Sequence, residues 1–111
     1  MALPKNNRLK KKRDFEAVFK TGKAVNGTFL FAKFKKSPSN VSRFGFVVSS
    51  KVAKKAVVRN RIRRALTATV QSGLLPRRQA YDTVVVVTRK ADSPDLLRKD
   101  LAEVIKRSGI L

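Results

Sequence analysis

The stretch KKAVVRNRIRRAL, residues 54–66, carries the side chains of this sequence best suited to bind phosphate. Its lysines and arginines can donate charge-assisted hydrogen bonds to phosphate oxygens, and no acid in the stretch competes for them. Asn60 can both donate and accept at a base edge or a 2′-hydroxyl. Lys51, Lys54 and Lys55 cluster where a helix would begin, so that lysines and free backbone N–H groups converge on an incoming phosphate. The pattern predicts a phosphate-binding helix, and an ordinary exposed basic helix is the alternative.

The overall charge points to the same kind of partner. The 111 residues carry 27 Lys and Arg against 7 Asp and Glu, which gives a net charge of +20. Residues 17–81 contain no acid at all. Self-repulsion on this scale opposes compaction and implies a polyanionic partner, whereas a surface that serves only solubility usually mixes both signs. Nucleic acid is therefore the expected partner.

Composition excludes several kinds of chemistry. The sequence has no Cys and no His, which excludes disulfides, zinc sites and Ser-His or Cys-His catalysis. Capping and solubility of the last helix are enough to explain Asp92, Asp95, Asp100 and Glu103. No pair of closely spaced acids near the basic stretch suits two catalytic metals. We therefore predict no catalytic residue in this polypeptide and assign it no metal site.

Length and hydropathy bound the organisation of the chain. A chain of 111 residues suits one compact domain, 1–111, in which residues 1–10 are expected to form a flexible basic arm. The segment MALPKNNRLKKKR is too polar for a signal peptide, and the longest apolar run, VVVV at 84–87, is too short to span a bilayer. A cytoplasmic location is expected.

Apolar periodicity and turn residues divide the chain into six elements. They are a helix over 12–21, strands over 28–36 and 43–50, a helix over 53–72, a strand over 83–88, and a last helix with Ser93 as N-cap and Pro94 at its first position. The expected fold is an α/β (α+β) two-layer sandwich with three helices and a central, mostly antiparallel sheet of three to four strands. The element order is α-β-β-(β)-α-β-α, in which the fourth strand is optional.

A helical wheel for residues 53–72 separates an inner face from a basic outer half. The inner face gathers Val58, Ile62, Ala65, Leu66 and Thr69. The outer half carries Asn60 and Arg64 opposite the sheet, with Arg59 and Arg63 on one flank and Arg61 on the other. One helix is thus expected to pack on the sheet while it presents guanidinium groups to solvent.

The segment SSKVAKKAVVRNRIRRAL, Ser49 to Leu66, resembles the signature of the bacterial ribonuclease P protein subunit, whose core is an Arg-Asn-Arg triplet, here residues 59–61. The stretch RLKKKRDFEAVFKTGK (8–23) is similar to the first helix of that family, and FGFVVSSK (44–51) to the strand before the signature. Beyond Gly73 the resemblance is one of pattern only.

The resemblance implies a protein cofactor of a catalytic RNA. The holoenzyme removes the 5′ leader of precursor tRNA and leaves a 5′-phosphate, with Mg²⁺ held in the RNA active site. Neither a membrane nor an obligate protein partner is implied. The family also has a left-handed strand–helix–strand crossover, which the general handedness rule does not predict. Contacts with the catalytic RNA are implied at Lys51, Lys54, Lys55, Arg59, Asn60, Arg61, Arg63 and Arg64.

Leader-binding residues are implied on the first helix. Phe15 and Phe19 match aromatic positions of the family's cleft, where stacking is worth about 1–3 kcal/mol per base. The same i, i+4 pair could equally be core. Lys11, Lys12 and Arg13, with Lys10, could steer phosphates or belong to a solvated arm. Where the family often has a strand aromatic in the cleft, this sequence has Ala32, with Phe31 and Phe34 nearby.

Two other classes of protein share the charge and the lack of Cys. A ribosomal or general RNA-binding protein would have no reason to reproduce the spacing around the Arg-Asn-Arg triplet. A DNA-packaging protein would more naturally show a dimerisation surface or a basic arm with a minor-groove wedge. Preference for precursor over mature tRNA distinguishes the ribonuclease P hypothesis from both.

Overall fold

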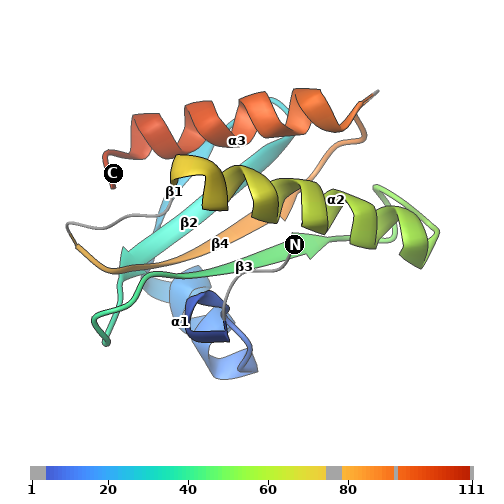
Figure 1. Ribbon diagram of the computed structural model, residues 1–111. Coiled ribbons are helices and arrows are strands. Elements are labelled where there is room, and N and C mark those ends of the chain that lie inside the picture. The colour runs from blue at the N-terminus through green and yellow to red at the C-terminus, as the bar shows by residue number, and fades with distance from the viewer. Residues whose placement is uncertain (1–4, 75–78, 92, 111) are drawn as a thin grey trace.

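The computed structural model describes residues 5–74, 79–91 and 93–110, which form a sheet with helices on both faces (Figure 1). The elements in chain order are a 3₁₀ turn at Lys5–Asn7, α1 (Lys12–Thr21), β1 (Lys23–Asn26), β2 (Leu30–Lys36), β3 (Arg43–Val48), α2 (Ala56–Thr69), a π-helical extension at Val70–Leu74, β4 (Tyr81–Val87) and α3 (Pro94–Ser108). In the described part of the chain, no helix is long and apolar enough to cross a membrane.

The four strands lie in the order β1-β2-β4-β3. β1 pairs with β2 and β2 with β4 in antiparallel fashion, whereas β3 and β4 are parallel and are connected through α2. The predicted fold class and element order are confirmed, and the optional fourth strand is β1. The parallel β3–α2–β4 connection is the place where the family resemblance implies a left-handed crossover.

The sheet is covered unequally. α2 and α3 lie side by side on one face, and α1 lies alone on the other (Figure 1). The larger core fills the α2–α3 side, where Leu66 and Leu101 are completely buried against the sheet. A smaller cluster under α1 is built on Leu9, Val18 and Val84. Because successive strand residues point to opposite faces, β3 and β4 contribute to both clusters, with Val47, Val84 and Val86 on the α1 side.

The turn between β1 and β2 is attached to α3 by a buried carboxylate. Asp100, only 7% exposed, accepts hydrogen bonds from the backbone N–H groups of Thr28, Phe29 and Leu30 at 2.9, 2.8 and 3.1 Å. A side chain on Gly27 would overlap the carboxylate. The interpretation of Asp100 as a solubility residue is therefore wrong, since it satisfies three main-chain donors that would otherwise be left without a partner.

Residues near the beginning of the chain contact β3 and the turn that precedes it. Asn7 Nδ2 donates to the carbonyl of Ser42 at 2.7 Å, and the Leu9 N–H donates to the carbonyl of Phe44 at 3.0 Å. Leu9 is 6% exposed and belongs to the cluster under α1. The part of the expected arm that the structure describes thus packs along β3, and residues 1–4 lie outside the described residues.

The helix boundaries follow local signals with one exception. α1 spans the predicted range and ends at Gly22, where a Cβ would overlap the carbonyl oxygen of Val18. α3 begins after Ser93, whose side chain makes no capping hydrogen bond, and it ends at Gly109 with a left-handed φ of 75°. α2 begins only at Ala56, later than expected, because the preceding residues form the loop from β3.

Candidate nucleic-acid interface

The outer face of α2 carries the predicted cations. Asn60, Arg61 and Arg64 are exposed and Arg59 and Arg63 are half-buried, whereas Ala65, Leu66 and Thr67 are buried toward the core. The predicted division between inner and outer faces is confirmed for this helix. We call Lys51, Lys54, Lys55 and the polar residues Arg59, Asn60, Arg61, Arg63 and Arg64 the α2 surface.

The start of α2 lacks the features that usually stabilise a helix N-terminus. Its first turn contains no acid, and the N-cap residue Lys55 makes no capping hydrogen bond with its side chain. Lys51, Lys54 and Lys55 are all exposed there. Cations near the positive end of the helix dipole oppose folding by about 0.3–1 kcal/mol each at low salt, but the same groups favour a bound anion.

Arg59 has a contact within the protein that the helical wheel did not predict. Its Nη1 donates to the carbonyl oxygens of Ala53 and Lys54 at 2.9 and 2.8 Å. These bonds attach the loop from β3 to the first turn of α2. Arg59 therefore helps to position Lys54, whatever further contacts its remaining N–H groups make.

Asn60 is likewise engaged with a neighbour. Its Oδ1 accepts a hydrogen bond of 2.7 Å from Nη1 of Arg63, one turn further along the exposed side of the helix. The bond fixes the orientation of one guanidinium group on the α2 surface. Arg61 and Arg64 are exposed beside this pair.

On the opposite face of the sheet, the two predicted aromatic residues of α1 differ in burial. Phe15 is half-buried and packs on β3, where a Cβ at Gly45 would overlap its ring. Phe19 is 37% exposed, and Lys33 Nζ lies 5.9 Å from the centre of its ring while donating to the Phe19 carbonyl at 2.8 Å. Phe15 is thus mainly a core residue, and Phe19 is an exposed ring beside a cation.

Ala32, the β2 position that the resemblance matches to a cleft aromatic, faces α2 and α3 and not α1. Ala32 is 2% exposed and belongs to the core under α2 and α3. Strand alternation places its neighbour Phe31 on the α1 side, where Phe31 pairs with Val86 of β4. Phe31 is half-buried there and lies two residues from Lys33 on the same face of β2.

The remaining predicted residues of this side are solvent-exposed. Lys11, Lys12 and Arg13 lie at the beginning of α1, and Lys12 pairs loosely with Glu16 at 4.0 Å. We call Lys11, Lys12, Arg13, Phe19, Phe31 and Lys33 the α1 surface. The shared position of Phe31 and Lys33 on one face was not predicted. The signal for it was their i, i+2 spacing on a strand, because two such side chains point to the same face.

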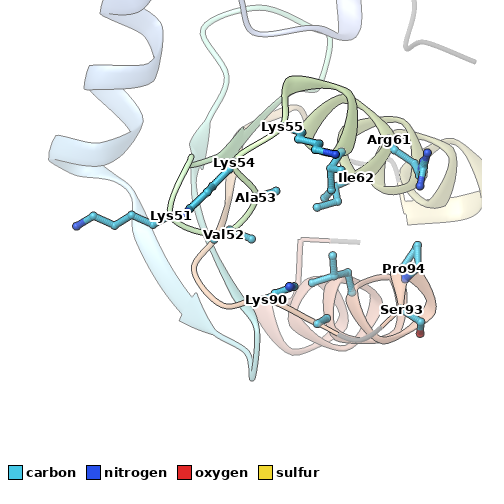
Figure 2. A pocket seen from close by; sticks show the side chains of 13 residues that line it. Lys51, Val52, Ala53, Lys54, Lys55, Arg61, Ile62, Lys90, Ser93 and Pro94 are labelled. Atoms are coloured by element: carbon cyan, nitrogen blue, oxygen red, sulfur yellow. The ribbon is translucent and has the colours of Figure 1, made fainter.

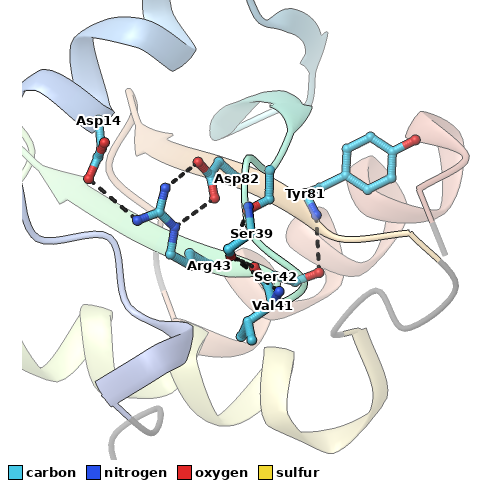
Figure 3. Close-up of polar contacts among 8 residues, drawn as sticks. Asp14, Ser39, Val41, Ser42, Arg43, Tyr81 and Asp82 are labelled. Carbon is cyan, nitrogen blue, oxygen red and sulfur yellow. Dashed lines mark hydrogen bonds and ion pairs between the residues drawn. The ribbon is translucent and has the colours of Figure 1, made fainter.

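An ion-pair network joins α1 to β3 and β4 (Figure 3). Arg43 donates from Nε and Nη2 to the two carboxylate oxygens of Asp82 at 2.9 and 2.6 Å, and from Nη1 to Asp14 at 3.4 Å. Asp82 is 1% exposed. The hydrogen bond with Asp82 is the main cause that raises the pKa of Arg43, so this guanidinium stays charged. Its charge is neutralised within the fold.

The fold and the two surfaces define a small, basic α/β protein of the RNA-binding class. A family model described as Ribonuclease P matches residues 3–109, nearly the whole chain. The chain belongs to the ribonuclease P protein family. It is therefore a component of an endoribonuclease that works with the ribonuclease P RNA.

Individual relatives agree with this assignment. The chain is 37% identical to the ribonuclease P protein component of Pseudanabaena sp. over 112 residues, which covers 98% of this chain and 97% of the relative. It is 32% identical to that of Synechocystis sp., covering 100% of this chain and 92% of the relative. The solved RNase P protein of Staphylococcus aureus superposes with a TM-score of 0.84 at 25% identity, covering 94% of this chain and 96% of that one. That of Thermotoga maritima superposes with a TM-score of 0.76 at 30% identity, covering 90% and 96%.

Proposed function

We propose that this chain is the protein cofactor of ribonuclease P and assists removal of the 5′ leader from precursor tRNA in the cytoplasm. The α2 surface binds the catalytic RNA, and the α1 surface binds the single-stranded leader. The observation that carries the proposal is the α2 surface itself, whose exposed cations have no acid on their own helix to pair with. Such an arrangement opposes folding unless phosphates neutralise it.

The two surfaces suit different parts of an RNA. Arg61 and Arg64 offer planar donors for phosphate oxygens, which give binding without base selection. Phe19 offers a partly exposed ring on which bases of any sequence can stack, beside the ammonium group of Lys33. A leader differs in sequence from one precursor tRNA to another, so a sequence-tolerant surface fits it.

The chemistry is assigned to the RNA. Hydrolysis of the phosphodiester, which leaves a 5′-phosphate on the mature tRNA, uses Mg²⁺ held in the RNA active site. In the parts of the chain that the structure describes, no three acidic, His or Cys side chains gather in a group that could hold a metal ion. The protein contributes binding and orientation of the two RNA molecules.

Cleavage of a precursor tRNA by a bacterial ribonuclease P RNA at low Mg²⁺, with and without this protein, tests the proposal. We expect cleavage to need RNA and protein together and to be absent with the protein alone. Precursor tRNA should bind more tightly than mature tRNA, and trimming the leader should abolish the difference. If the protein neither stimulates cleavage nor prefers the precursor, the proposal is wrong and general RNA binding becomes the better account.

A further inference from the structure

A pocket of about 490 Å³ opens between the start of α2 and the connection from β4 to α3 (Figure 2). Its volume lies within the roughly 300–1,000 Å³ of sites that take small molecules. Residues 51–55, one side of α2, and Lys90, Ala91, Ser93, Pro94 and Leu97 line it, so it joins segments that are distant in sequence. Arg59 shapes one wall through its hydrogen bonds to the carbonyl oxygens of Ala53 and Lys54.

The inner part of the pocket is apolar. Val52 and Leu97 are 7% and 3% exposed, and the partly buried Ile62 of α2 also lines this part. These side chains belong to the main core or pack against it, so this part of the lining is rigid. Transfer of a flat apolar group from water into this part of the pocket is favourable, because it buries apolar surface.

The rim is cationic. Lys54, Lys55 and Arg61 reach it from α2 and the loop before it, and Lys90 reaches it from the connection to α3. Figure 2 shows Lys55 and Arg61 on one side of the opening and Lys90 on the other, while Lys51 extends away from it. None of the described residues that line the pocket is an acid. A ligand that fits both the apolar inner part and the cationic rim has a flat apolar group and at least one phosphate.

We infer that this pocket takes a single unpaired nucleotide of the RNA partner, with its base against Val52, Ile62 and Leu97 and its phosphates between Lys55 and Lys90. The inference rests on the proposed function. Arg61 belongs both to the rim and to the α2 surface, so an RNA strand that crosses α2 passes the mouth of the pocket. Unpaired nucleotides can be splayed out of an RNA, whereas a base within a duplex cannot enter such a pocket.

The experiment compares variants of the full chain in complex with ribonuclease P RNA. Lys90→Ala removes a rim cation, and Arg89→Ala is the matched control, because Arg89 is exposed, adjacent and outside the pocket. Ala53→Leu narrows the pocket without a change of charge. We expect Lys90→Ala and Ala53→Leu each to weaken binding about tenfold, the size of one charged hydrogen bond or a comparable loss of burial, and Arg89→Ala to change it less than twofold.

Chemical probing of the RNA supplies the second measurement. With the unmodified protein, one isolated unpaired nucleotide should be protected, and Lys90→Ala and Ala53→Leu should expose it while the wider protection by α2 stays. Equal effects of Lys90→Ala and Arg89→Ala, or normal binding and protection with Ala53→Leu, would overturn the pocket and leave the proposed function intact. If the unmodified protein does not bind the RNA, both the inference about the pocket and the proposed function are wrong. Unchanged thermal melting of each variant establishes that the differences are not losses of folding.

Discussion

Arg43 on one face of the sheet and the arginines of α2 on the other use positive charge in opposite ways. Under α1, Arg43 is held by Asp82 and Asp14, so its charge is neutralised inside the protein. On α2, Arg61 and Arg64 are exposed on a helix without a single acid. A cation of the first kind is part of the fold, and a cation of the second kind is available to a partner. The same substitution, Arg to Ala, should therefore change stability at Arg43 and binding at Arg61 or Arg64.

The largest effect is expected from Arg43→Ala. Removing this guanidinium leaves the carboxylate of Asp82, 1% exposed, without its charged partner. Loss of one member of a buried ion pair typically costs about 3–5 kcal/mol, and the 22% exposure of the Arg43 side chain favours the lower end. Chemical denaturation should show a fall of about 3 kcal/mol in the free energy of unfolding. A loss below about 0.5 kcal/mol, the range of ordinary surface substitutions, would contradict a structural role for the pair.

The aromatic residues of α1 sharpen the comparison within one helix. Phe19→Ala should lower affinity for precursor tRNA by about 1–3 kcal/mol, the value of one stacked base, and leave affinity for mature tRNA unchanged. Phe15→Ala is the matched control, because its ring packs on Gly45 and the cluster with Val18. It should instead destabilise the protein by about 2 kcal/mol, less than a fully buried Phe would.

Competition binding with both tRNAs and a thermal melt of each variant distinguish the two roles. Phe19 belongs to the core, and the leader-binding part of the proposal is wrong, if Phe19→Ala melts at as low a temperature as Phe15→Ala. The same conclusion follows if Phe19→Ala lowers the affinity for mature tRNA as much as that for precursor tRNA.

Patterns repeated along one element were predictable from sequence, and pairings between elements were not. The stripe of Phe15, Val18 and Phe19 was enough to place α1, and the run of β-branched residues was enough to place β4 to within two residues. β1 has four residues of which only Val25 is half-buried, so it carries no alternation to detect. It exists because β2 pairs with it and Asp100 holds the intervening turn.

The candidate site shows the same limit. Outward positions on α2 follow from the helical repeat, so Arg61 and Arg64 were placed correctly. The bond of Arg59 to the preceding loop depends on the path of that loop, which no periodicity encodes. The face of β2 is a second case, because a shift of one residue moves a strand side chain to the other face of the sheet. Ala32 lies in the core under α2 and α3, whereas its neighbour Phe31 lies on the α1 side.

The α2 surface is tested by Arg61→Ala, which should weaken binding to ribonuclease P RNA without altering stability. Loss of a charged hydrogen bond to phosphate is worth about 1.5–3 kcal/mol, and solvent exposure places the effect at the lower end, about 1.5–2 kcal/mol. The slope of log K against log salt should fall by about 0.7–0.9, the contribution of one phosphate. Arg59→Ala should reduce both binding and melting temperature, since its guanidinium also holds the loop. Equal stability losses for the two variants would mean that Arg61 is not free for a partner.

The smallest effect, about 0.5–1.5 kcal/mol of RNA affinity, is expected from Asn60→Ala, because Asn60 acts at least partly through its neighbour. Its Oδ1 orients Arg63 by a hydrogen bond on the exposed side of α2. A double-mutant cycle with Arg63→Ala separates that role from a direct contact with RNA. If Asn60 only orients Arg63, Asn60→Ala should have no further effect once Arg63 is removed, and the two losses should not add. If the losses add fully, Asn60 contacts the RNA by itself, and the middle residue of the Arg-Asn-Arg triplet is a reader of the RNA rather than a support for an arginine.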